Sequence, residues 1–109
     1  MTDLFDRSCV PCEGGVAPLN PIEASKLGGE IHADWLISPD STSLSRAYQF
    51  RDFYRTMSFV NAVAHIANAE DHHPDLEIGY NYCRIKYTTH AIGGLSANDF
   101  ICAAKIDRL

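Results

Sequence analysis

The sequence lacks the features that mark membrane proteins, secreted proteins and direct binders of nucleic acid. None of its apolar runs is long enough to span a bilayer. The opening residues, MTDLFDRS, hold acidic side chains and no apolar segment of the kind found in signal peptides. There is no block of basic residues, and the formal net charge is −5. We therefore expect a soluble cytoplasmic protein that contacts neither a membrane nor, directly, a nucleic acid.

The four cysteines lack the spacing of a complete structural metal site. Cys9 and Cys12 form a single C-x-x-C, while Cys83 and Cys102 stand alone. A structural zinc site usually draws its four ligands from two such pairs, and no thioredoxin-like pattern surrounds this one. We interpret Cys9 and Cys12 as free thiols in a turn. Cys83 and Cys102 are expected to be small core residues.

The remaining composition is typical of one globular domain. The 109 residues are 46% hydrophobic and 21% charged, with no internal repeat and no low-complexity segment. We expect a single domain over residues 1–109, with an irregular leader over 1–19 that lies on the surface. A chain of this length buries only a small core, and oligomerisation would enlarge it.

The first half of the chain predicts a short helix and a hairpin. Asn20-Pro21-Ile22-Glu23 has the N-cap, the proline and the acidic residue of a helix start, and Gly28-Gly29 ends this helix. Alternating apolar residues predict strands over 31–37 and 44–50, joined by a turn. Arg46 interrupts the apolar side of the second strand.

The second half predicts a long helix, another hairpin and a last helix. Asp52 can cap a helix that runs to about Asp71 and is ended by Pro74. Strands are predicted over 75–80 and 82–89, and the last helix begins near Ser96. The order α-β-β-α-β-β-α predicts an α+β fold, in which three helices pack on one face of a four-stranded antiparallel sheet.

Three of the histidines lie at expected element ends, where a scaffold can present side chains to a ligand. They are His72, His73 and His90. Three interpretations are open: metal ligands, acid–base groups, or caps of a helix terminus. Neighbouring side chains on a helix end point about 100° apart, so His72 and His73 would share one ion poorly. Capping of a helix terminus needs only one histidine. Two adjacent histidines, with a third before Gly93-Gly94, therefore make the capping interpretation less favourable.

The chain resembles the pterin-4a-carbinolamine dehydratases over nearly its whole length. The motifs that carry the resemblance are Ala69-Glu70-Asp71-His72-His73-Pro74, Tyr80, Thr89-His90, Gly93-Gly94-Leu95-Ser96 and the run from Asp99 through Ala103, Ala104, Ile106 and Asp107. The leader C-V-P-C-E-G-G is similar to that of bacterial members. Asn68 departs from the family, which usually has a charged residue at this position.

The resemblance implies the α+β fold, a homodimer or homotetramer, and a reaction that uses no metal or organic cofactor. The implied reaction removes water from a 4a-hydroxytetrahydropterin and leaves a quinonoid dihydropterin, which recycles the pterin of an aromatic amino-acid hydroxylase. By resemblance, the catalytic residues are His72, His73 and His90. His72 and His90 would be the acid–base pair, and His73 would help to bind the substrate.

The resemblance also assigns Asp71, Pro74 and Asp99 to substrate binding, although Asp99 could equally serve only to cap the last helix. Proximity makes Asp71 a candidate to orient a neighbouring histidine. Members of this fold also act without catalysis, as dimerisation or assembly cofactors of other proteins. A non-catalytic protein-binding role is therefore the alternative, and a metal-binding protein comes third.

Overall fold

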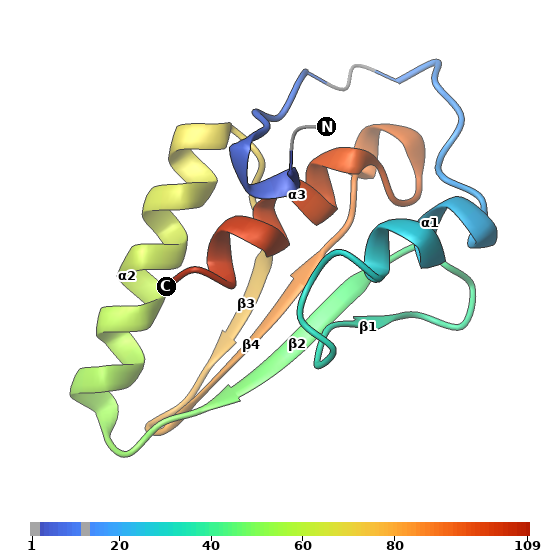
Figure 1. The fold of residues 1–109 in the computed structure, drawn as a ribbon. Helices are drawn as coiled ribbons and strands as arrows, with labels where there is room; N and C mark the ends of the chain where they lie inside the picture. Colours follow the sequence, from blue (N-terminus) through green and yellow to red (C-terminus); the bar gives the residue numbers. More distant parts are fainter. Residues whose placement is uncertain (1–2, 12–13) are drawn as a thin grey trace.

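Three helices lie on one face of a four-stranded antiparallel sheet (Figure 1). The computed structural model describes residues 3–11 and 14–109. The sheet order is β1-β2-β4-β3, with β1 at Leu36–Ile37, β2 at Leu44–Gln49, β3 at Asp75–Ile78 and β4 at Tyr82–Tyr87. The helices are α1 (Pro21–Gly28), α2 (Phe53–Glu70) and α3 (Ala97–Ile106). The predicted fold class and element order are confirmed.

Local capping explains where the helices begin. Asn20 accepts a hydrogen bond from the backbone of Glu23 at 2.8 Å, and the Glu23 carboxylate accepts one from the backbone of Asn20. Asp52 caps α2 by accepting from the backbone N–H of Arg55 at 2.9 Å. These side chains satisfy amide groups that have no partner inside the helix, so the predicted starts of α1 and α2 are confirmed.

The strand predicted over 31–37 is much shorter than expected. Only Leu36–Ile37 pairs with β2, and the preceding residues form turns. Trp35 is buried as expected, but its indole Nε1–H donates to Asp107 Oδ1 at 2.7 Å. The backbone N–H of His32 donates to the same carboxylate. Contacts to the end of α3 therefore hold this segment, and they take the place of the predicted strand pairing.

Arg46 lies on the inner face of β2 because it has a partner there. Its guanidinium donates to Asp107 Oδ1 at 3.0 Å and lies 4.4 Å from the ring centre of Tyr48. A charged side chain can occupy an otherwise apolar face when it is paired in this way.

Helix α3 is buried on nearly all sides. Asn98, Asp99 and Cys102 are buried along with the apolar residues Phe100, Ile101, Ala103, Ala104 and Ile106. The leader supplies the extra cover: Leu4, in the short 3-10 helix η1 (Leu4–Asp6), is 3% exposed and belongs to the core. Leu4 therefore anchors the leader in the core, while residues 6–8, 10 and 11 are exposed, in keeping with a segment that lies on the surface. Cys12 lies outside the described residues.

The part of the chain that the structure describes has no helix long and apolar enough to cross a membrane.

Candidate active site

A left-handed residue ends α2 and separates the two adjacent histidines. Asp71 has φ 51° and ψ 44°, and the backbone N–H groups of Asp71 and His72 both donate to the carbonyl of Ala67. This geometry usually belongs to glycine and turns the chain sharply out of a helix. The predicted end near Asp71 is confirmed, since α2 ends at Glu70, but the left-handed Asp71 forms the cap and not Pro74. Beyond the turn, His72 is largely buried, whereas His73 is exposed.

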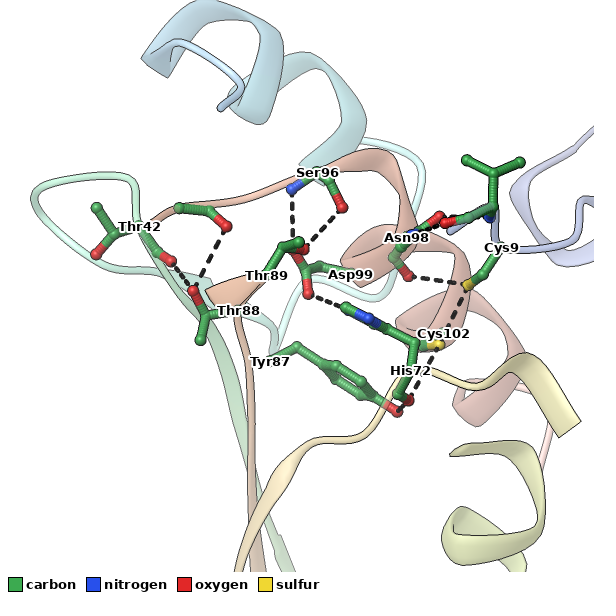
Figure 2. A network of polar contacts seen from close by, with 12 residues as sticks. Cys9, Thr42, His72, Tyr87, Thr88, Thr89, Ser96, Asn98, Asp99 and Cys102 are labelled. Carbon is green, nitrogen blue, oxygen red and sulfur yellow. Dashed lines mark hydrogen bonds and ion pairs between the residues drawn. The ribbon is translucent and has the colours of Figure 1, made fainter. Parts of the chain in front are cut away.

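His72 is held by a carboxylate from the first turn of α3 (Figure 2). Its Nε2–H donates to Asp99 Oδ1 at 2.6 Å, across 27 residues of sequence. The imidazole also stacks on Tyr87, with ring centres 5.4 Å apart and planes 12° apart. The Tyr87 hydroxyl donates to the carbonyl of His72 at 3.4 Å. The ring is fixed in place, and Nδ1 remains for exchange of a proton with a ligand.

Asp99 is itself held from the other side. Its Oδ2 accepts from the Thr89 hydroxyl at 2.8 Å and from the Ser96 backbone N–H at 2.9 Å, and the carboxylate is fully buried. The Ser96 hydroxyl lies 2.8 Å from that of Thr89 (Figure 2). The three donors to Asp99 fit an ionised carboxylate, since a buried charge must be hydrogen-bonded. Asp99 both caps α3 and orients His72.

Burial and Asp99 act in opposite directions on His72. Burial by itself lowers the pKa of the imidazole, because it disfavours the charged form. The hydrogen bond and the negative charge of Asp99, with smaller effects of Cys102 and Asp71, together outweigh burial, and the pKa of His72 is raised above its ordinary value. His72 is therefore protonated to a greater extent near neutral pH than an ordinary histidine.

The predicted histidines share one cavity of about 520 Å³. Asp71, His72 and His73 line it from the end of α2, and His90 lines it from the 3-10 helix η2 (His90–Ile92), which follows β4. The side chain of His73 is held by Asn68, whose amide oxygen lies 3.0 Å from Nε2. The other lining residues are Cys9, Val10, Pro11, Glu70, Thr88, Thr89, Ala91 and Asn98.

Two of the residues predicted to bind substrate do not line this cavity. Asp99 lies behind His72 and reaches a ligand only through that ring. Pro74 leads into β3 and is also absent from the lining. The direct role of both residues in binding remains a prediction. The leader residues on the wall were missed, because nothing local in the sequence indicates which surface an irregular segment will cover.

Among residues 3–11 and 14–109, no group of three or more histidine, cysteine or acidic side chains is arranged to hold a metal ion. His72 engages Asp99 and His73 engages Asn68, so these two rings are oriented by different partners.

Comparison with known sequences points to one family. The family model described as "Pterin 4 alpha carbinolamine dehydratase" matches residues 17–109. A protein of Nitrosomonas eutropha that carries the pterin-4-alpha-carbinolamine dehydratase name is 56% identical over 107 residues, which cover 98% of this chain and 93% of the relative. A Legionella pneumophila protein with the same name is 52% identical over 108 residues, covering 99% and 96%.

Two solved structures share the fold. A transcriptional coactivator/pterin dehydratase from Brucella melitensis superposes with a TM-score of 0.77 at 24% identity, over 84% of this chain and 96% of that one. A pterin dehydratase-like protein described as a RuBisCO assembly factor of the alpha-carboxysome superposes with a TM-score of 0.60 at 20% identity, over 71% and 89%. At these identities the likeness concerns the fold alone.

Proposed function

We propose that this chain, which belongs to the pterin-4a-carbinolamine dehydratase family, eliminates water from a 4a-hydroxytetrahydropterin by histidine acid–base catalysis. The observation that carries the proposal is the buried Asp99–His72 pair at the wall of a cavity that His90 also lines. An imidazole whose Nε2 is fixed, with Nδ1 left for a ligand, is suited to proton transfer.

The reaction requires two proton transfers. The 4a-hydroxyl must gain a proton to leave as water, and N5 must lose one as the C4a–N5 double bond forms. We assign the first step to His72, because its raised pKa favours the protonated ring. His90, which lines the same cavity from η2, is assigned to the second. Each positioned acid or base typically contributes about 10²–10⁴-fold to the rate.

His73 and Asp71 complete the proposal as groups that bind the pterin. When Nε2–H of His73 donates to the Asn68 amide oxygen, Nδ1 of His73 is free to accept from a donor on the substrate. Asp71 lies on the same wall and offers a carboxylate. Asp99 acts on the ligand through His72, and a direct contact of Pro74 or Asp99 with the pterin remains a prediction.

The cellular setting is also part of the proposal. We propose a cytoplasmic homo-oligomer that returns the pterin of an aromatic amino-acid hydroxylase to use. The thiols of Cys9, Cys83 and Cys102 are free, which agrees with a reducing compartment.

A dehydration assay tests the proposal. The 4a-hydroxytetrahydropterin is generated in place, and quinonoid dihydropterin is followed by absorbance with and without the protein, in the presence of EDTA. We expect a clear acceleration that survives EDTA. His72→Ala and His90→Ala should each lower turnover at least tenfold, because each removes one proton-transfer group.

His65→Ala is the matched control, since His65 is an exposed residue of α2 that does not line the cavity. Wild-type turnover in a folded His72 or His90 variant would remove that residue from the mechanism. No acceleration by the folded wild-type protein would favour the non-catalytic, protein-binding alternative.

A further inference from the structure

We propose that Cys9 and Cys102 form a reversible disulfide that locks the leader against α3 at the wall of the cavity, with a low-molecular-weight disulfide such as oxidised glutathione as the oxidant. The two sulfur atoms lie 3.6 Å apart, although 93 residues of sequence separate them (Figure 2). A disulfide bond is about 2.05 Å long, so the sulfurs must approach by only roughly 1.5 Å.

The backbone around Cys9 is already docked where the bond would form. The N–H of Cys9 donates to Glu70 Oε1 at 2.8 Å, which ties the leader to the end of α2. The N–H and the carbonyl of Val10 both pair with the Asn98 side chain, at 3.0 and 2.6 Å. The disulfide would therefore preserve an existing arrangement, in which Cys9 belongs to the leader and Cys102 to the middle of α3.

The two thiols differ in access. Cys102 is fully buried, whereas Cys9 is partly exposed and lines the cavity. A small reagent can therefore reach Cys9 through the cavity but cannot reach Cys102. This order of access is typical of a thiol pair in which one cysteine reacts first and the other resolves the product.

The surroundings favour a thiolate within the pair. Hydrogen bonding from Cys9 lowers the pKa of Cys102 against the opposing effect of burial, and Tyr87 and the charge of His72 act in the same direction as Cys9. The same hydrogen bond raises the pKa of Cys9. The resting thiolate is therefore on Cys102. The hydrogen bond between the thiols provides a path by which the proton of Cys9 can cross to Cys102, and the reaction proceeds through the small fraction of Cys9 thiolate that this transfer supplies at the cavity.

The chemistry then balances in two exchange steps. The Cys9 thiolate attacks the small disulfide, forms a mixed disulfide and releases one small thiol. The Cys102 thiolate attacks the Cys9 sulfur, forms the Cys9–Cys102 bond and releases the second small thiol. Two electrons pass from the cysteine pair to the oxidant. One released small thiolate takes up the proton that the pair held, and the other takes up a proton from solvent.

The bond would change the cavity wall next to His72. The Cys102 sulfur lies 4.0 Å from the His72 carbonyl oxygen, and Cys9, Val10 and Pro11 form the facing part of the wall. With both cysteines reduced, non-covalent contacts hold this stretch of the leader: hydrogen bonds to Asn98 and Glu70, and packing of Cys9 against the core. Oxidation would fix this part of the wall covalently until a thiol reductant cleaves the disulfide.

Peptide mapping of the full-length protein after treatment with oxidised glutathione tests the inference. We expect one linked peptide pair that joins Cys9 to Cys102, reversed by dithiothreitol. The Tm of the oxidised protein should rise by at least about 5 °C, because the bond closes a long loop of the unfolded chain. Amide exchange at Cys9 and Val10 should slow at least tenfold.

Three variants make the outcome decisive. Cys12→Ser should leave the linkage and the Tm rise unchanged, whereas Cys9→Ser, which leaves the α3 core intact, should abolish both. Cys83→Ala is the control for a buried cysteine of β4. A Cys9–Cys12 bond, glutathione adducts alone, or full resistance of the folded protein to oxidation would overturn the inference. None of these readouts uses dehydratase activity, so the proposed function and this inference can fail separately.

Discussion

At the scale of single residues, the behaviour of His72 depends on one buried carboxylate. Burial and Asp99 shift its pKa in opposite directions, and Asp99, with smaller effects of Cys102 and Asp71, prevails. The pair is well shielded from water, since the side chain of His72 is 12% exposed and that of Asp99 is 0% exposed. Solvent therefore screens the interaction much less than it screens a surface ion pair.

Replacing this carboxylate should lower the pKa of His72. In Asp99→Asn the hydrogen bond to the carboxylate and its charge are lost, while the smaller effects of Cys102 and Asp71 remain, so we expect the pKa of His72 to fall. NMR titration of the His72 ring protons measures this change. Asp75→Asn, at an exposed carboxylate of β3, is the control and should leave the titration of His72 unchanged.

The same pair makes stability depend on pH with a defined sign. Because the folded-state pKa of His72 is raised, the contribution is complete below the unfolded value of about 6.5 and is lost as the pH rises through the folded value. The wild-type protein should therefore exceed Asp99→Asn in free energy of unfolding by about 2 kcal/mol at pH 5.5, and by less at pH 8.5. An equal difference at both pH values would contradict the assigned pair.

At the scale of elements, the turn after α2 decides how the histidines are presented. Asp71 adopts a left-handed conformation, after which His72 is buried and His73 is exposed. A positive φ is costly for residues with a branched side chain, whereas glycine adopts it without strain. The turn therefore constrains the residue type at position 71 through the backbone, independently of any contact with a ligand.

Substitutions at this turn should follow the rule for positive φ. Asp71→Val should lower the free energy of unfolding by about 1–2 kcal/mol, whereas Asp71→Gly should preserve or slightly raise it. Urea unfolding measures both changes. The matched control is Asp75 in β3, where extended backbone should reverse the order and make glycine the worse substitution. The same order at both positions would contradict the role of the turn.

At the scale of the whole molecule, exposed apolar surface gathers where α2 begins beside the β3–β4 hairpin. Phe53 stacks on Tyr80 with ring centres 6.4 Å apart, and these side chains are 49% and 66% exposed. Tyr54 is 81% exposed, and Ile78 of β3 is 40% exposed. Strand β3 also ends the sheet order, so it is an edge strand. Such features are common on surfaces that associate.

We therefore expect a homodimer or homotetramer in solution. Light scattering after size exclusion should give two or four times the chain mass of 12.1 kDa. Tyr54→Ser should shift the assembly to a smaller species at low concentration, because it removes apolar surface from this region. Asn61→Ser, at an exposed polar position of the same helix, is the control. A wild-type monomer at high concentration would show the prediction of an oligomer to be wrong.

Sequence by itself determined the features that depend on neighbouring residues. Asn20, Asp52 and Ser96 mark helix starts because their interactions reach only three residues along the chain. Hydrophobic periodicity likewise predicted α2 and the strands β2, β3 and β4, since burial on one face follows the geometry of the backbone. The motif around His72, His73 and His90 indicated three side chains that line the cavity.

Tertiary structure alone decided which distant groups meet. The pairing of Asp99 with His72, of Asp107 with Trp35 and Arg46, and of Cys9 with Cys102 joins segments far apart in the chain. Most of the segment predicted as the first strand forms turns in the structure. Leu4 of the leader belongs to the core that also contains α3. No local pattern encodes these contacts, because they depend on how the elements pack, and packing is set by the shape and burial of the whole core.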